Sequence, residues 1–154
     1  MILRNREITK WKEMQAIIDE AEVCYVGMTD GDQPYVLPFN FSIRDETIFL
    51  HSDNVGYKLE LIEKNPKVCI NFNTGNELFH RHQQVACSWG MKYKSVNAFG
   101  KIQFIEDYDE KYQIMKEFMR KYAGEDFEFS EPAIKNVKIM AIQVEKFTGK
   151  KYGY

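Results

Sequence analysis

The chain has 154 residues, of which 44% are hydrophobic and 29% charged, and its formal net charge is −2. This composition is typical of a folded globular protein and excludes an intrinsically disordered chain. The small net charge argues against nucleic acid as a partner, because proteins that bind nucleic acid usually carry a basic surface. We expect residues 1–154 to form a single domain, since this length suits one hydrophobic core.

The apolar runs, cysteines and histidines of the sequence bear on the location of the protein and on metal binding. The first seven residues lack the apolar segment of a signal peptide, and no apolar run is long enough to span a bilayer. Cys24, Cys69 and Cys87 are an odd number without a Cys-x-x-Cys pair, so we interpret them as reduced thiols in the cytoplasm. His80 and His82 have only Cys87 as a further ligand nearby in the sequence, and we therefore expect no metal site. Cys87 has no identifiable base beside it, and its role and those of the two histidines stay open.

In chain order, the hydrophobic pattern predicts three helices and five or six strands. The expected helices cover 9–21, with Thr9 as N-cap, 54–64, and a segment that begins at a capping box at Asp107 and stops at Gly124. The expected strands cover 23–28, 35–43, 47–51, 68–73, 93–106 and 137–145, whereas residues 74–84 give no clear pattern. Helices and strands do not alternate as in βαβ units. We therefore expect an antiparallel barrel with peripheral helices.

The strand over 35–43 has one face that requires an explanation. Tyr35, Leu37, Phe39, Phe41 and Ile43 alternate along it and form a core face. The other face carries Val36, Pro38, Asn40 and Ser42, which are too polar for a core. Proline cannot donate to a neighbouring strand. This face either lies at a sheet edge or lies against a ligand.

The segment 51–58 combines a strand end with a helix start. It contains the Ser52 hydroxyl, the flexible backbone of Gly56 and the Lys58 ammonium group. Backbone N–H groups at a helix N-terminus are unpaired and partly positive, which suits a phosphate. The alternatives are that Ser52 is a plain N-cap and Lys58 a solvated surface lysine. His51 is either a ligand contact or a core histidine.

The segment 87–97 opens the long strand over 93–106. Tyr93, Ser95 and Asn97 form its polar face, which faces either solvent or a ligand. Trp89 and Tyr93 could stack on an aromatic ring, although large aromatic residues are more often found in cores and interfaces. The core face of this strand is expected to contain the alternating residues Val96, Ala98, Gly100, Ile102 and Phe104.

Together these segments resemble a known family. The matching motifs are Gln33-Pro34-Tyr35-Val36-Leu37-Pro38-Phe39-Asn40-Phe41, His51-Ser52, Gly56-Tyr57-Lys58-Leu59, Cys87-x-Trp89, Tyr93-Lys94-Ser95-Val96, Gly100, Glu145 and Thr148-Gly149-Lys150. They resemble the flavin-binding split-barrel proteins related to pyridoxamine 5′-phosphate oxidase. Within that family they are most similar to the branch of 5-nitroimidazole-resistance proteins.

The resemblance implies a mainly β (α+β) fold, a six-stranded antiparallel split barrel that forms a homodimer with two FMN molecules at its interface. FAD in place of FMN stays open. By motif position, Ser52 and Lys58 hold the FMN phosphate and Ser95 adds a hydroxyl group. The other candidate cofactor contacts are Val36, Pro38 and Asn40 along the isoalloxazine ring, Trp89 and Tyr93 at the ring or the interface, and His51 and Gly56 near the phosphate.

The function that this resemblance implies is an FMN-dependent oxidoreductase, similar to a nitroreductase, that reduces a small organic acceptor. The alternatives are a flavin-storing protein without turnover and a haem-binding relative on the same barrel. The tail over 147–154 lacks the arginine- and histidine-rich motif with which pyridoxamine phosphate oxidase holds its substrate, so vitamin B6 oxidation is not expected. No residue is identified as a catalytic acid or base.

Overall fold

The computed structural model describes residues 4–154, so residues 1–3 at the start of the segment inspected for a signal peptide lie outside the described part. The helices are α1 (Trp11–Glu20), α2 (Tyr57–Lys64), α3 (Tyr108–Ala123) and α4 (Glu131–Asn136), with 3₁₀ turns at Arg4–Arg6 and Ala86–Ser88. The strands are β1 (Glu7–Ile8), β2 (Cys24–Asp30), β3 (Gln33–Phe39), β4 (Phe41–Arg44), β5 (Thr47–Asp53), β6 (Lys67–His80), β7 (Trp89–Ile105) and β8 (Val137–Tyr152).

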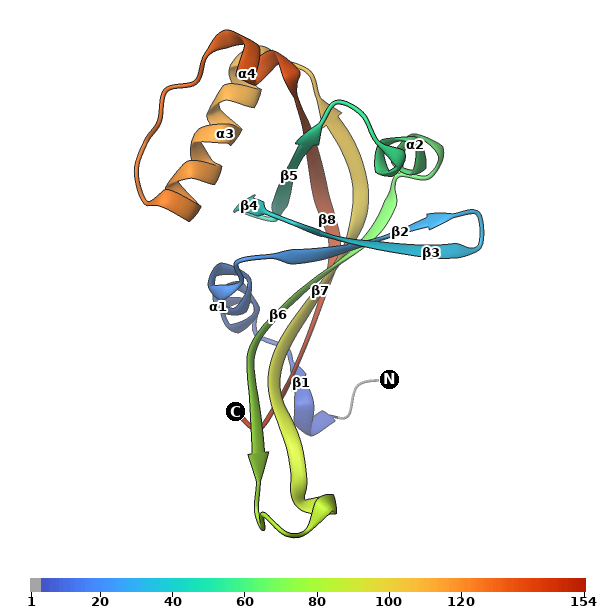
Figure 1. Cartoon of the computed structure of the whole chain (residues 1–154), viewed down its shortest axis with the longest axis vertical. Coiled ribbons are helices and arrows are strands. Elements are labelled where there is room, and N and C mark those ends of the chain that lie inside the picture. The colour runs from blue at the N-terminus through green and yellow to red at the C-terminus, as the bar shows by residue number, and fades with distance from the viewer. Residues whose placement is uncertain (1–3) are drawn as a thin grey trace.

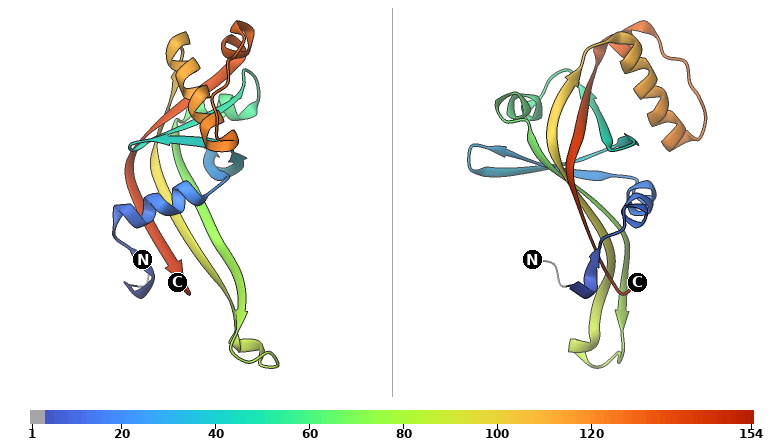
Figure 2. Two further views of the ribbon diagram at one scale, coloured as in Figure 1. Left: turned by 90° about the vertical axis from the view of Figure 1, so that its left-hand side faces the viewer. Right: turned by 180° about the vertical axis from the view of Figure 1, so that it is seen from behind.

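All strands belong to one antiparallel sheet whose hydrogen-bonded order is β3-β2-β6-β7-β8-β5-β4, with β1 added to β8. The sheet is strongly twisted, with α3 and α4 at one end and the β6–β7 hairpin projecting from the other (Figures 1 and 2). Its two edge strands, β3 and β4, are consecutive in the sequence and separated by Asn40 alone. If β3 and β4 count as one bent strand, the barrel has six main strands, and the predicted split-barrel fold is confirmed.

The prediction of one continuous strand over 35–43 is wrong, because the strand breaks at Asn40. Beyond the break Ser42, expected on the polar face, is buried. The cause lies far away in the sequence, at the end of α3. The Tyr122 hydroxyl accepts a hydrogen bond from the Phe41 N–H at 3.0 Å and donates to the Glu22 carbonyl at 2.8 Å. Tyr122 therefore replaces sheet hydrogen bonds where the strand is interrupted.

Replacement of Tyr122 by phenylalanine is expected to destabilise the protein by about 1–3 kcal/mol, because the Phe41 N–H then loses its partner. Urea unfolding monitored by circular dichroism measures this change. The matched control is Tyr108→Phe, since Tyr108 is exposed on the same helix and its hydroxyl has no hydrogen-bond partner within residues 4–154. If the two variants lose the same stability, Tyr122 does not support the break.

The barrel interior follows the predicted core faces. Val96, Ala98, Gly100 and Ile102 of β7 are all buried, and the consecutive residues 139–142 of β8 are buried on both faces of the sheet, as their apolar run predicted. At Gly100 only glycine fits, because a Cβ atom would lie 2.6 Å from the Gln143 carbonyl oxygen.

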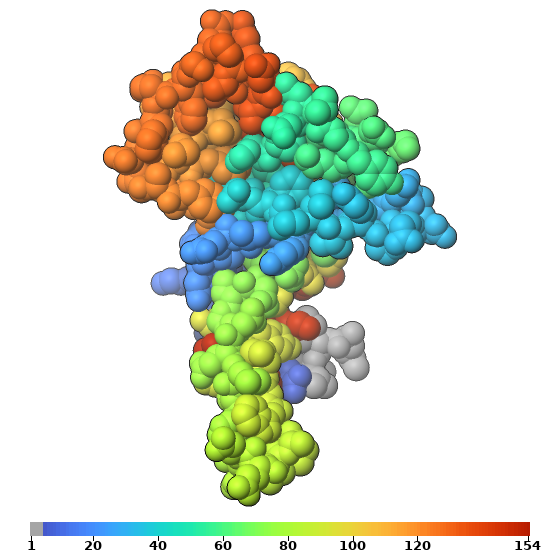
Figure 3. Space-filling model, in the orientation of Figure 1, coloured from blue at the N-terminus to red at the C-terminus, as the bar shows by residue number. Residues whose placement is uncertain are grey.

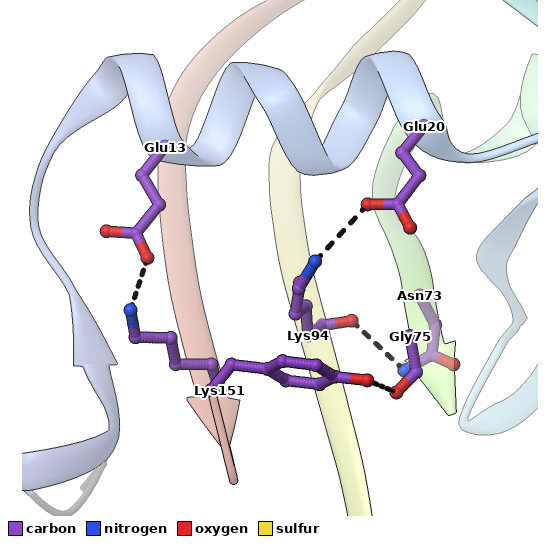
Figure 4. Close-up of polar contacts among 7 residues, drawn as sticks. Glu13, Glu20, Asn73, Gly75, Lys94 and Lys151 are labelled. Carbon is purple, nitrogen blue, oxygen red and sulfur yellow. Dashed lines mark hydrogen bonds and ion pairs between the residues drawn. The ribbon is translucent and has the colours of Figure 1, made fainter. Parts of the chain in front are cut away.

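Helix α1 crosses one face of the sheet and is tied to it by two ion pairs (Figure 4). Glu13 pairs with Lys151 of β8 at 2.6 Å, and Glu20 pairs with Lys94 of β7 at 3.5 Å. The expected N-cap is wrong: the helix is preceded by Lys10 and has no side-chain cap. Because the helix lacks a cap, its stability depends mainly on packing, and Met14, Ile17 and Ile18 are the residues that it buries against the sheet.

Other boundaries differ from the predicted ones for local reasons. Asp107 is confirmed as the N-cap and Gly124 as the stop, since the Asp107 side chain accepts from the Glu110 N–H and Gly124 is left-handed. Strand β6 continues through the unassigned segment 74–84 as far as His80, with a register shift after Thr74. Strand β8 runs seven residues beyond its predicted end, and α4 was not predicted.

None of the helices within residues 4–154 has the length and apolarity to cross a bilayer.

Candidate functional site

A cavity of about 560 Å³ lies where the β3–β4 break meets the end of β5, the start of α2 and the end of α4. Its size is that of a typical small-molecule site. Five of the ten predicted site residues line it, namely Pro38, Asn40, His51, Ser52 and Lys58. They converge because β4 and β5 are neighbouring strands and α2 follows β5 directly.

The phosphate end of the predicted site is assembled around the start of α2. Gly56 precedes the helix with a φ of 134°, a conformation that favours glycine, and a Cβ atom built there would lie 3.4 Å from the Lys58 Nζ. The ammonium group therefore folds back over the helix N-terminus. It has no ion-pair partner among residues 4–154. A cation that lies over a helix N-terminus without an ion-pair partner is the arrangement of an anion site.

Ser52 is the last but one residue of β5, so the interpretation of Ser52 as a plain N-cap is wrong. Its hydroxyl donates to the Asp53 carbonyl at 2.9 Å and keeps its lone pairs for other partners. Asp53 also lines the cavity, but its side chain is exposed, so water screens its charge.

His51 lies between the cavity and α3. Its ring meets the Phe118 ring edge-on with 4.6 Å between centroids, and it is half-buried. Burial lowers the pKa of His51, and the nearby Asp53 carboxylate opposes this shift only in part. A lowered pKa favours the neutral imidazole, in which one ring nitrogen donates a hydrogen bond and the other accepts one.

The lowered pKa of His51 makes folding depend on pH in a defined direction. In the unfolded chain His51 binds a proton below about pH 6.5, whereas the folded protein resists this proton, so stability falls as the pH drops below 6.5. Between pH 7 and pH 5 the wild type is expected to lose more unfolding free energy than His51→Gln. Urea unfolding at both pH values measures it, and an equal loss in both proteins contradicts this environment for His51.

Sequence reasoning missed the wall of the cavity formed by the end of α4. Ala133, Asn136 and Val137 line this side. A signal for this helix was present, because Ser130 is its N-cap and a proline follows two residues later, as is common in the first turn of helices. The helix has only six residues, which is too short for its apolar residues to show the periodicity of a helix.

The other five predicted residues do not line the cavity, and of these Gly56 lies beside the Lys58 ammonium group. Val36 is next to the cavity on β3, with 59% of its surface exposed. Trp89, Tyr93 and Ser95 lie on the part of β7 that belongs to the projecting β6–β7 hairpin, on the opposite side of the β2–β3 crossing from α2 (Figure 1). A single chain does not bring these three residues to the cavity.

Contacts within the hairpin occupy two of these side chains. The Trp89 indole N–H donates to the Gln83 carbonyl at 3.0 Å, and its ring lies 4.4 Å from that of His80. Ser95 is buried, and its hydroxyl accepts from the Asn71 amide at 2.9 Å. The same Asn71 amide donates to Asn97 at 2.6 Å. The polar face of β7 is thus internally hydrogen-bonded.

The remaining reactive side chains are dispersed. His80, His82 and Cys87 are exposed near the tip of the hairpin. Within residues 4–154, no three His, Cys, Asp or Glu side chains are grouped as metal ligands would be. Burial raises the pKa of the Cys24 thiol to about 12 and also raises the pKa of Cys69. Cys24 is therefore a packing residue and not a nucleophile.

The sequence profile of the pyridoxamine 5′-phosphate oxidase family matches residues 10–151. The chain belongs to this family. The match includes every residue that lines the cavity, and the family expected from the sequence motifs is confirmed. None of the proteins with curated descriptions matches the sequence.

Several solved structures share the fold of this protein. A Bacteroides thetaiotaomicron protein, provisionally named a 5-nitroimidazole antibiotic resistance protein, is 38% identical, with a TM-score of 0.85 over 94% of this chain and 86% of that chain. A flavocytochrome from Azotobacter vinelandii is 16% identical, with a TM-score of 0.83 over 99% of this chain and 73% of its own. A FAD and haem binding protein from Mycobacterium smegmatis is 13% identical, with a TM-score of 0.81 over 97% and 74%. The last two likenesses show the fold.

Proposed function

We propose that this protein binds FMN in the cavity and is an oxidoreductase that reduces a small organic acceptor, as nitroreductases do. The observation that carries the proposal is the unpaired Lys58 ammonium group, which lies over the Gly56 end of α2 in the same cavity as Ser52. Membership of the pyridoxamine 5′-phosphate oxidase family and the 38% identity to a nitroimidazole-resistance protein support it.

The residues present fit the two ends of FMN. Lys58, Ser52 and the helix N–H groups would hold the phosphate. The outward face of β3, with Val36 and Pro38 exposed, and the exposed Asn40 that follows it would lie along the isoalloxazine ring. When bound, FMN supplies the electron transfer, and the chain supplies binding, orientation and shielding from water.

We further propose that a second copy of the chain completes the site. The hairpin that carries Trp89 and Tyr93 projects from the barrel (Figure 3) and exposes Leu78, Trp89 and Met91. Large exposed apolar side chains of this kind are typical of interfaces. Light scattering is expected to give twice the mass of one chain, and a monomer would contradict the homodimer.

The free thiols suit the reducing cytoplasm, which we propose as the location.

The first experiment is a visible spectrum of the purified protein, with chromatography of the released chromophore. Flavin bands and released FMN are expected, and released FAD would correct the cofactor. Oxidation of NAD(P)H with a nitroaromatic acceptor then tests turnover. A colourless protein that does not take up added FMN would overturn the proposal.

The same experiments separate the two alternatives. Stable flavin binding without turnover across donors and acceptors would favour a storage protein. A Soret band on addition of haemin would favour a haem protein, the reading that the names of two structural relatives raise. Loss of that band in His51, His80 or His82 variants would identify the ligand.

A further inference from the structure

Helix α2 is fastened at both of its ends to two consecutive residues of β2. At its start, the Tyr57 hydroxyl donates to the Asp30 carboxylate. After its last turn, the Asn65 side-chain amide donates to the Thr29 hydroxyl at 3.0 Å. Figure 2 shows α2 beside the β2–β3 hairpin. The helix that carries Lys58 is thus held against a hairpin from another part of the chain.

Tyr57, at the start of α2, also contacts a residue of β3. The Tyr57 ring meets the Tyr35 ring edge-on, with 5.4 Å between centroids. Tyr57 directly precedes Lys58, and Tyr35 directly precedes Val36. One side chain therefore links the two neighbourhoods proposed for the opposite ends of the cofactor.

The distance between the two ends of the site matters for FMN binding. Its phosphate and its ring are joined by a chain of limited length, so both ends bind well only when their protein contacts are correctly spaced. Displacements of about 0.5 Å are enough to weaken a preorganised site. Because Tyr57 is 45% exposed, its ring contributes little to the core, and its hydroxyl is the part that fixes α2 to the hairpin.

We propose that Tyr57 and Asp30 are a positioning pair, which sets the place of the Lys58 ammonium group relative to β3 and thereby favours FMN over riboflavin. This inference rests on the proposed function. Neither residue lines the cavity, and neither belongs to the predicted cofactor contacts. In this proposal each acts through the position of Lys58. The hydrogen bond to the carboxylate also raises the pKa of Tyr57, which keeps the hydroxyl protonated as a donor.

The test measures dissociation constants for FMN and riboflavin by flavin fluorescence in the full-length protein. Tyr57→Phe keeps the ring contact with Tyr35 and removes only the hydroxyl. We expect it to weaken FMN binding about fivefold to tenfold and riboflavin binding less than about twofold. Asp30→Leu should have the same effect, and Asp30→Asn, whose amide oxygen still accepts, should retain most of the FMN affinity. The double variant Tyr57→Phe/Asp30→Leu should be no weaker than either single variant.

The matched control is Tyr25→Phe, because Tyr25 is an exposed tyrosine on the same strand as Asp30. Unchanged FMN binding in Tyr57→Phe, or equal losses for FMN and riboflavin, overturns the inference. If Lys58→Ala changes the ratio of the two affinities but Tyr57→Phe does not, only the positioning role fails. If Lys58→Ala also leaves the ratio unchanged, the proposed phosphate site fails, and the positioning role fails with it.

Discussion

Replacement of Lys58 by alanine is expected to weaken FMN binding by about 1.5–3 kcal/mol, the range for a hydrogen bond to a charged group. The half-buried ammonium group lies over the N-terminus of α2 and has no carboxylate partner within residues 4–154. Its full charge is therefore available to a phosphate. Riboflavin, which lacks the phosphate, should lose much less affinity.

Fluorescence titration of both flavins measures this difference, and the helix supplies its own control. Lys64 is an exposed lysine in the last turn of α2, so Lys64→Ala removes the same charge from the other end of the same helix. We expect Lys64→Ala to leave the ratio of FMN to riboflavin affinity unchanged. Equal losses for both flavins in Lys58→Ala would show that this residue does not contact the phosphate.

Replacement of Phe72 by alanine is expected to destabilise the protein by about 3–5 kcal/mol, a large part of the stability of an ordinary domain. Phe72 lies at the centre of β6, is completely buried, and meets the Phe41 ring edge-on at 4.8 Å. Its removal leaves a cavity between strands that form opposite parts of the sheet, and those strands cannot collapse to fill it.

Chemical denaturation with urea measures this loss, and Phe72→Leu keeps the test informative if the alanine variant does not fold. The leucine variant should lose less, because it fills most of the volume. Phe127→Ala is the control, since Phe127 is exposed in the loop before α4 and should cost within about 0.5 kcal/mol. If Phe72→Ala costs no more than Phe127→Ala, the core is not packed around this ring.

Local patterns predicted the parts of the fold that local forces decide. The alternation along β7 identified its buried face, because successive side chains of a strand point to opposite sides. The Asp107 cap and the Gly124 stop depend on neighbours within one helical turn. By contrast, the break at Asn40 depends on Tyr122, and no pattern around residue 40 contains that information. The outer part of β6 is exposed on both faces and lacks the alternation that reveals a half-buried strand.

The candidate site also contains residues that local sequence predicted and residues that it could not predict. Pro38, Asn40, His51, Ser52 and Lys58 converge because they lie on consecutive elements that the short turn at Asp45 and the loop before α2 bring together. Asn136 comes to the cavity only when β8 pairs with β5, so its position was not accessible to local reasoning. Trp89, Tyr93 and Ser95 were predicted from motif position, and their place in the site stays a prediction that depends on the second copy.

The position of β8 in the sheet has a consequence for how the chain folds during synthesis. β8 is the last strand along the sequence, yet it pairs with β7, β5 and the early strand β1, in registers such as Thr47 with Gln143 and Glu7 with Lys150. Until β8 leaves the ribosome, the β4–β5 hairpin has no neighbour, and its unpaired edge is open to other nascent chains. Such late, long-range pairing also makes closure slow. The inner edge of β5 is therefore protected only once β8 has paired with it.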